Sequence, residues 1–406
     1  MEYLSVIFYY FLLCSMVMLL GFLIHLRLKQ GQRVFEEEYN KGIDLYDQQS
    51  YTDAIKAFRS AIEIEPKKPD TFYNLGLAYL ALDNTEKAET NFARAANLNS
   101  TDPDAYYNLG ILLFNKKKYV EAAKKFKFAI KLNPNDPDSY YNLALALIES
   151  RNYEEGIKNI DNALALSPGN FLYLLFKATA FDKKSDISGM KRDIDFAIEF
   201  YNKVLELDPK NEESNLRLAI CYAKLGMWEE SVNFCNTVLQ INPGSFEAYN
   251  QFGLALYCRG DIDDAVKMYQ KALSLKPGFN AVNKNLGYAY EKQGNYQDAI
   301  NSFNKFLSLI PKSSHEFAEI SNHLNELKQS INESKYSNNK IKKVDNDENT
   351  DNIKEAEVIV KETENNNIEI QESIISPADT QEFIAEESVI QENIKTESDE
   401  PEENHV

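Results

Sequence analysis

A five-residue pattern recurs along this chain at a fixed interval of 34 residues. It reads YYNLG at 106–110, FYNLG at 72–76 and YYNLA at 140–144, with a weaker EYNKG at 38–42. A constant interval of this length constrains the fold more than any other feature of the sequence. Each copy must be one structural unit, and neighbouring units must stack to bury a continuous core.

The prolines keep the same interval. Pro209, Pro243, Pro277 and Pro311 follow one another at 34 residues, and Pro134 and Pro168 do the same. Before Pro134, the segment EAAKKFKFAIKLNP has apolar residues at spacings of three and four, which is typical of one buried helix face. Proline disfavours helix at its own position and at the preceding residue. Each period therefore predicts two helices, the first carrying the five-residue pattern and the second ending near proline.

This chain resembles the tetratricopeptide repeat (TPR) proteins, whose unit is a 34-residue helix-turn-helix. In the third copy the matching residues are Tyr106, Leu109, Gly110, Ala122, Phe126, Ala129 and Pro134. The resemblance implies an all-α fold, a right-handed TPR superhelix of eight repeats over residues 35–313. The fifth repeat contains a seven-residue insertion at about 183–193, for which we expect a lengthened turn between its helices.

An apolar stretch precedes the repeats. Residues 3–24 carry no charge, and a helix of this length rises roughly 33 Å, enough to cross a bilayer core of about 30 Å. We expect a transmembrane anchor helix over residues 3–27. The alternative, a cleaved signal peptide, lacks a basic start and a small-residue cleavage site. Basic residues follow the stretch and only Glu2 precedes it, which predicts an outside N-terminus and a cytoplasmic TPR domain at the plasma membrane, or the inner membrane of a bacterium.

Two further segments follow the last repeat. Residues 314–335 have apolar residues at helical spacing and predict a capping helix for the open end of the solenoid. Residues 336–406 hold 20 acidic residues and 6 lysines, which is −14 of the net charge of −19. We expect this acidic, low-complexity tail to be disordered. Its short apolar islands are either drift or linear motifs that bind a partner or the chain's own groove.

The predicted repeats carry little catalytic chemistry. The sequence has no phosphate-binding glycine loop, no HExxH and no GxSxG motif, and its four histidines lie outside the repeats. We expect no enzyme activity, no metal, no cofactor and no small-molecule substrate; an activity within the insertion is the remaining enzyme hypothesis. The cysteines form no CxxC and are expected to be buried. The folded part lacks the excess of basic residues that nucleic-acid binding requires.

The second aromatic residue and the asparagine of each copy lie on the side of the first helix opposite its packing positions. We expect these asparagines to form a ladder along the concave groove and to bind the backbone of an extended peptide, because an amide both donates and accepts. The alternative is that they bond only within or between neighbouring helices. The candidate groove residues are Tyr39, Asn40, Tyr73, Asn74, Tyr107, Asn108, Tyr141, Asn142 and Asn285.

This pattern is similar to the asparagine ladder in the TPR superhelix of O-linked N-acetylglucosamine transferases, where it holds peptide main chain. The basic residues of a chaperone-binding carboxylate clamp are missing, because the flanking positions hold residues such as Leu77 and Ile111. We therefore expect a membrane-anchored scaffold or adaptor that mediates protein–protein interaction. The alternative is an extracytoplasmic structural or assembly protein that organises envelope components.

Overall fold

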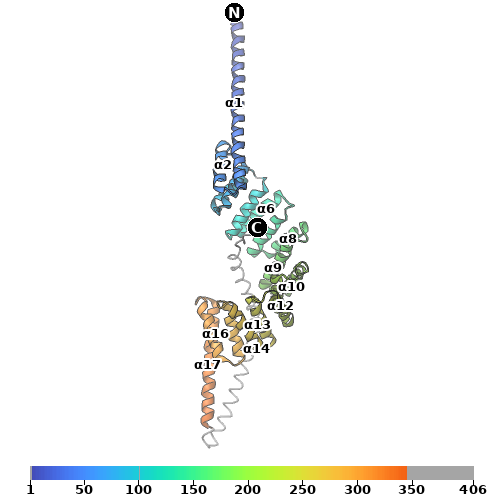
Figure 1. Ribbon diagram of the computed structural model, residues 1–406, viewed down its shortest axis with the longest axis vertical. Helices are drawn as coiled ribbons and strands as arrows, with labels where there is room; N and C mark the ends of the chain where they lie inside the picture. The colour runs from blue at the N-terminus through green and yellow to red at the C-terminus, as the bar shows by residue number, and fades with distance from the viewer. Residues whose placement is uncertain (1, 100, 345–406) are drawn as a thin grey trace. The chain divides into compact units, whose positions relative to one another are not determined.

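The computed structural model describes residues 2–99 and 101–344, with the backbone alone for residues 2–11, 14 and 334–344. In this part of the chain there are seventeen α-helices and no strand (Figure 1). Most of the acidic tail predicted to be disordered, residues 345–406, lies outside the described residues. The expectation of an all-α fold is confirmed for the described part.

Sixteen helices form eight consecutive pairs, each packed on the next, as the eight predicted repeats require. The pairs are α1 (Glu2–Asp47) and α2 (Tyr51–Ile64), α3 (Pro69–Leu80) and α4 (Thr85–Leu98), α5 (Pro103–Asn115) and α6 (Tyr119–Leu132), α7 (Pro137–Glu149) and α8 (Tyr153–Leu166), α9 (Phe171–Ser188) and α10 (Lys191–Leu207), α11 (Glu212–Lys224) and α12 (Trp228–Ile241), α13 (Phe246–Arg259) and α14 (Ile262–Leu275), and α15 (Asn280–Lys292) and α16 (Tyr296–Leu309).

The helices divide into two units, which we describe separately. Unit 1 comprises residues 1–173 and contains α1 to α8 with the start of α9. Unit 2 begins at Leu174 and contains the rest of α9 and the helices after it.

The glycine of the five-residue pattern makes room for an aromatic ring. A Cβ atom on Gly110 would lie 2.5 Å from Cε1 of Phe126, which belongs to the second helix of the same repeat and is fully buried. This refines the expectation that the glycine admits a neighbouring helix. The same pairing, 16 residues apart, occurs at Gly42 and Phe58, Gly76 and Phe92, Gly253 and Tyr269, and Gly287 and Phe303. In the fourth repeat Ala144 replaces glycine, and the residue 16 positions later is the smaller Ile160.

The turn within a repeat contains one residue in the left-handed region. In three repeats of unit 2 it is glycine, for example Gly226 with φ of 71°. In the first four repeats the same position holds a side chain, with φ between 56° and 64°, at Gln49, Asp83, Lys117 and Arg151. Left-handed backbone is unfavourable for residues with a Cβ atom. Stacking of the repeats therefore imposes this turn on sequences that do not favour it.

The seven extra residues of the fifth repeat extend its helices and not its turn. Helix α9 has 18 residues and α10 has 17, compared with 13 and 14 in the preceding pair. The turn between them is short, at Gly189 and Met190. The predicted lengthened turn is therefore wrong. Asp182, Ser185 and Ile194 are buried, so the added turns of helix contribute to the interior.

Helix α1 begins well before the first repeat, and its C-terminal part packs against α2 (Figure 1). Large apolar side chains between Leu12 and Leu28 are exposed, Met18 to 71%. Among the described residues, no helix combines the length and the apolar character of a membrane span. The anchor predicted over 3–27 is thus not supported; residues 3–11 and Cys14 of that range lie outside the described side chains.

Helix α17 (His315–Val344) packs on α16, as expected of a capping helix. Ile320, Leu324 and Leu327 are buried against Phe303 and Phe306. The backbone stays helical beyond the predicted end at residue 335 and into the segment predicted to be disordered, as far as Val344.

Candidate functional site: the tyrosine–asparagine ladder

Asparagine and tyrosine side chains of successive repeats are hydrogen-bonded along the first helices of unit 1. In each bond, the Nδ2 of an asparagine donates to the hydroxyl oxygen of a tyrosine 35 residues earlier. The distances are 2.9 Å from Asn74 to Tyr39, 3.2 Å from Asn108 to Tyr73, and 3.0 Å from Asn142 to Tyr107. These bonds join α1 to α3, α3 to α5 and α5 to α7. We call the helix faces that carry them the ladder face.

The orientation of two of these amides is fixed by a second bond. Nδ2 of Asn108 also donates to the backbone oxygen of Asp104 at 3.0 Å, and Nδ2 of Asn142 donates to that of Asp138 at 2.9 Å. A carbonyl oxygen can only accept, so the nitrogen must face it. The Oδ1 atoms of both asparagines accept no hydrogen bond from the described residues. The amide N–H groups therefore bond between and within helices, and the amide oxygens remain acceptors.

The tyrosine rings of the ladder pack within their own repeats. The ring centroid of Tyr107 lies 5.8 Å from that of Phe126, and the ring of Tyr73 lies 5.6 Å from that of Phe92. This packing is contrary to the expectation that the second aromatic residue lies away from the packing surface. Burial, followed by the charge of Asp138, raises the pKa of Tyr107. The hydroxyl therefore stays protonated, and its hydrogen is available to an acceptor.

Three aspartates accompany the ladder and were missed in the sequence. Asp70, Asp104 and Asp138 each lie four residues before a ladder asparagine, which places them on the same helix face. All three are exposed, and none forms a salt bridge within the described part of the chain. Burial and the nearby charges of Asp102 and Asp136 raise the pKa of the Asp104 carboxyl. The signal was a Pro-Asp pair that precedes each of these copies.

Tyr173 at the start of α9 ends the ladder of unit 1. Its hydroxyl donates to Oδ1 of Asp138 at 2.5 Å, and its ring stacks on Tyr141 with centroids 5.1 Å apart. Phe176 occupies the asparagine position of the fifth repeat, 34 residues after Asn142. A phenyl ring has no amide, so the series of asparagines stops here. At the other end, Asn40 is exposed and makes no hydrogen bond with the described residues.

The remaining predicted site residue, Asn285, lies in unit 2 and has a different environment. Its Nδ2 donates to Oδ1 of Asn250 at 3.1 Å, again 35 residues earlier. Asn285 is only 5% exposed, and its Oδ1 has no partner among the described residues. The fully buried Gln251, one repeat before Asn285, has neither polar atom bonded in that part of the chain. The contact between repeats persists here, but the amide is enclosed.

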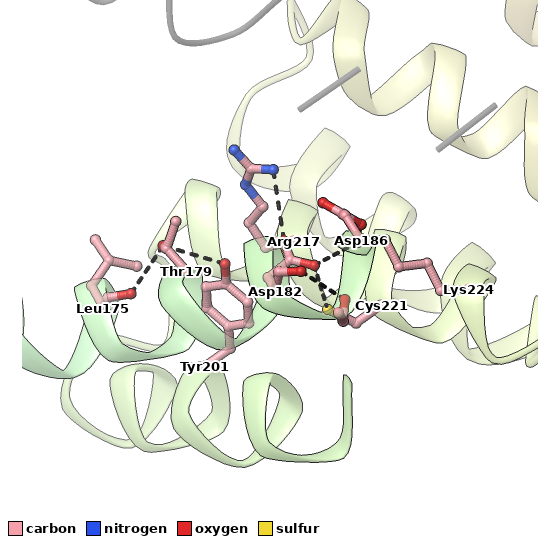
Figure 2. A network of polar contacts seen from close by, with 9 residues as sticks. Leu175, Thr179, Asp182, Asp186, Tyr201, Arg217, Cys221 and Lys224 are labelled. Carbon is pink, nitrogen blue, oxygen red and sulfur yellow. Dashed lines mark hydrogen bonds and ion pairs between the residues drawn. The ribbon is translucent and has the colours of Figure 1, made fainter. Parts of the chain in front are cut away.

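A second polar cluster lies inside unit 2, where it joins α9 to α11 (Figure 2). Its centre is the carboxylate of Asp182, which accepts a hydrogen bond from Nζ of Lys224 at 2.7 Å. The same carboxylate lies 3.8 Å from the Arg217 guanidinium and 3.7 Å from Sγ of Cys221. Lys224 also pairs with Asp186. Arg217 stands at the asparagine position of the sixth repeat, so this repeat has an ion pair where the ladder has an amide.

The charges in this cluster stabilise one another against burial. Burial opposes ionisation of Asp182, but Lys224 and Arg217 hold the pKa of its carboxyl below the ordinary value. Burial likewise opposes the charge of Lys224, whose pKa is raised by Asp182 and Asp186. Burial and the charge of Asp182 raise the pKa of the Cys221 thiol. A reactive cysteine needs a thiolate, so the cluster provides structure and not a nucleophile. Across the described residues, no group of His, Cys, Asp or Glu side chains could hold a metal ion.

Comparison with protein-family models identifies the repeats. A model described as "TPR repeat" matches residues 42–83, and three described as "Tetratricopeptide repeat" match residues 73–139 and 250–314, 126–158, and 191–252. The chain belongs to the TPR family. The matched ranges coincide with the stacked helix pairs of both units. No curated protein sequence matches the chain.

Solved structures of bacterial TPR proteins have a similar fold. Residues 41 to the end of MamA from Desulfovibrio magneticus RS-1 are 24% identical, with 44% of this chain and 97% of that chain covered and a TM-score of 0.40. PilF of Pseudomonas aeruginosa is 18% identical, with 54% and 96% covered and a TM-score of 0.42. A TPR protein from Parabacteroides merdae ATCC 43184 is 16% identical, with 63% and 99% covered and a TM-score of 0.45.

Proposed function

We propose that this TPR protein is a non-enzymatic scaffold or adaptor that binds an extended segment of a protein partner on the ladder face. TPR domains are in general protein–protein interaction scaffolds. The observation that carries the proposal is the series of asparagine amides, repeated once per helix pair, whose oxygens accept no bond from the described residues. An extended peptide presents its backbone N–H groups at regular intervals and can donate to such acceptors.

The hydrogen bonds to tyrosine favour this function. Asn108 and Asn142 each hold two bonds that fix the side chain before any partner arrives. A group that is already ordered loses little conformational entropy on binding. The bonds within the ladder and the contacts with a partner therefore use different atoms of one amide.

The test is position-specific photocrosslinking in the full chain, in cells of the source organism. A photoreactive residue at Asn40, which is exposed and free of hydrogen bonds to the described residues, reports contact with the ladder face. The matched position is the exposed Lys124 on the second helix α6. We expect an adduct with one protein from position 40 and not from position 124. The purified partner should then bind the Asn74→Ala/Asn108→Ala/Asn142→Ala variant more weakly. Equal crosslinking from both positions would refute the proposed site.

We further propose that the start of the chain holds the protein at a membrane, with the repeats in the cytoplasm. The uncharged run at 3–24 and the exposed apolar side chains from Leu12 to Leu28 support this proposal, although the described residues contain no membrane span. Carbonate-resistant membrane association of the full chain, and its loss on deletion of residues 2–28, is the expected result. Recovery of the full chain in the soluble fraction would contradict it.

Protease treatment of spheroplasts tests the orientation. We expect the repeats to be protected until the membrane is permeabilised, because basic residues follow the apolar stretch. Digestion of the repeats in intact spheroplasts would instead favour the extracytoplasmic assembly protein.

A further inference from the structure

The ladder face presents more hydrogen-bond acceptors than donors. Both N–H bonds of Asn108 and of Asn142 are used within the protein, and their amide oxygens are free of donors among the described residues. The carboxylates of Asp70, Asp104 and Asp138 add further acceptors on the same face. A surface of this kind is complementary to a partner that supplies N–H groups.

These acceptors are also negatively charged and have no cation beside them. No lysine or arginine in the described residues forms a salt bridge with Asp70, Asp104 or Asp138, or with the flanking Asp102 and Asp136. A negative charge in the first turn stabilises a helix, which explains a single acid on each helix. It does not explain why the acids of successive repeats stand close enough to oppose the ionisation of Asp104. A cation from a partner would relieve that repulsion.

Aromatic side chains lie along the same face. Tyr73 and Tyr107 are half-buried, and their hydroxyls are at the ladder bonds. The rings of tyrosines attract ammonium and guanidinium groups, particularly next to carboxylates. The face therefore combines three features that favour lysine and arginine: free acceptors, unpaired negative charge and aromatic rings.

We propose that the ladder face of α3, α5 and α7 binds a basic, extended segment of the partner protein. Lysine or arginine side chains of this segment pair with Asp70, Asp104 and Asp138, and its backbone N–H groups donate to the asparagine oxygens. This inference rests on the proposed function. It also makes the chain's own tail, with 20 acidic residues and 6 lysines, an unfavourable occupant of the same face.

Fluorescence anisotropy with two labelled probes tests the proposal. The probes are a decapeptide of alternating Lys and Thr and its Glu-Thr counterpart, added to the full chain solubilised in detergent. The test variant is Asp70→Asn/Asp104→Asn/Asp138→Asn, which keeps side-chain shape. The matched control, Glu63→Gln/Glu86→Gln/Glu121→Gln, removes as many charges from exposed positions on the second helices α2, α4 and α6. Both variants keep the acidic tail.

The Lys-Thr peptide should bind the unaltered chain more tightly than the Glu-Thr peptide. Its affinity should fall about tenfold in the aspartate variant, as expected for the loss of three partly exposed ion pairs, and change less than about twofold in the control. Equal losses in the two variants, or equal binding of the two peptides, would overturn the proposal. Circular dichroism checks folding, and the single Asp104→Asn variant replaces the triple one if that does not fold.

The outcome can be separated from that of the proposed function. If the crosslinked partner depends on Asn74, Asn108 and Asn142 but binds the aspartate variant with unchanged affinity, the ladder face is a binding site and the basic character of its partner is refuted. If Asn40 gives no adduct and the Lys-Thr peptide still selects the three aspartates, the charge preference stands without the proposed scaffold.

Discussion

Asn108 on α5 donates a hydrogen bond to the hydroxyl of Tyr73 on α3, at a distance of 3.2 Å. The same nitrogen donates to the backbone oxygen of Asp104. One amide thus joins two repeats and at the same time holds its oxygen in position. Structural and binding roles, which appeared as alternatives in the sequence, can coexist in this side chain.

Substitution Asn108→Ala should lower the free energy of unfolding by about 1–2 kcal/mol, because two hydrogen bonds are lost at about 1 kcal/mol each. Tyr73→Phe, which removes only the hydroxyl, should lower it by about half as much. Urea unfolding followed by circular dichroism measures both values. If neither substitution changes stability, the bond between repeats contributes nothing, and the amide is left with a binding role alone.

Gly110→Ala should destabilise the third repeat by about 1–3 kcal/mol, because the new Cβ atom would lie 2.5 Å from the ring of Phe126. Adding Phe126→Ile, the combination that Ala144 and Ile160 form naturally, should recover part of the loss. Gly278→Ala, with no atom within 4 Å, serves as the control. A double variant that is less stable than the sum of the two single changes would refute this pairing.

Lys117→Gly should stabilise the protein by about 0.5–1 kcal/mol, because Lys117 has φ of 58° in a turn where other repeats use glycine. The neighbouring Lys118 has φ of −88°, so Lys118→Gly should instead destabilise it. The two midpoints of thermal unfolding should therefore move in opposite directions. A shift of both to lower temperature would show that the left-handed backbone is not a strain at this position.

Lys224→Met should reduce stability by about 3–5 kcal/mol, because Asp182 and Asp186 would lose their shared cation inside unit 2. Lys203→Met removes a partner of Glu199 from an exposed i,i+4 pair and should cost less than about 1 kcal/mol. Denaturant titration distinguishes the two. Similar small effects in both variants would mean that the cluster tolerates an unpaired acid through Arg217 or water.

The capping helix should loosen as the pH rises through the titration of His323. Burial lowers the pKa of this imidazole, but the hydrogen bond of 2.8 Å to Glu291, with the charges of Glu291, Glu326 and Glu319, raises it above 6.5 overall. A raised folded-state pKa gives stability that is complete below the unfolded-state value and is lost as the pH passes the folded-state value. Hydrogen exchange of α17 amides should therefore accelerate above neutral pH.

In His323→Gln the pH dependence of that exchange should disappear, because glutamine does not titrate in this range. The ordinary exchange of unprotected amides sets the baseline at each pH. Persistence of the dependence in His323→Gln would assign it to another group.

The sequence by itself determined the repeat fold. A 34-residue interval, two apolar helix faces per interval and proline near the end of each second helix leave few alternatives, because only stacking buries such faces. The pairing of glycine with an aromatic residue 16 positions later was also present in the letters, at Gly110 and Phe126. It becomes interpretable only when the ring is seen to occupy the space of the missing Cβ atom.

Tertiary structure decided what each polar side chain contacts. The bond from Asn108 to Tyr73 spans 35 residues, and no local rule specifies which side of the helix a ring of Tyr107 will pack against. The insertion shows the same limit: its length is visible in the sequence, but burial of Asp182 against Lys224 and Arg217 made it helix and not turn. Contacts between repeats depend on how the helices stack, and that geometry arises from all the buried faces together.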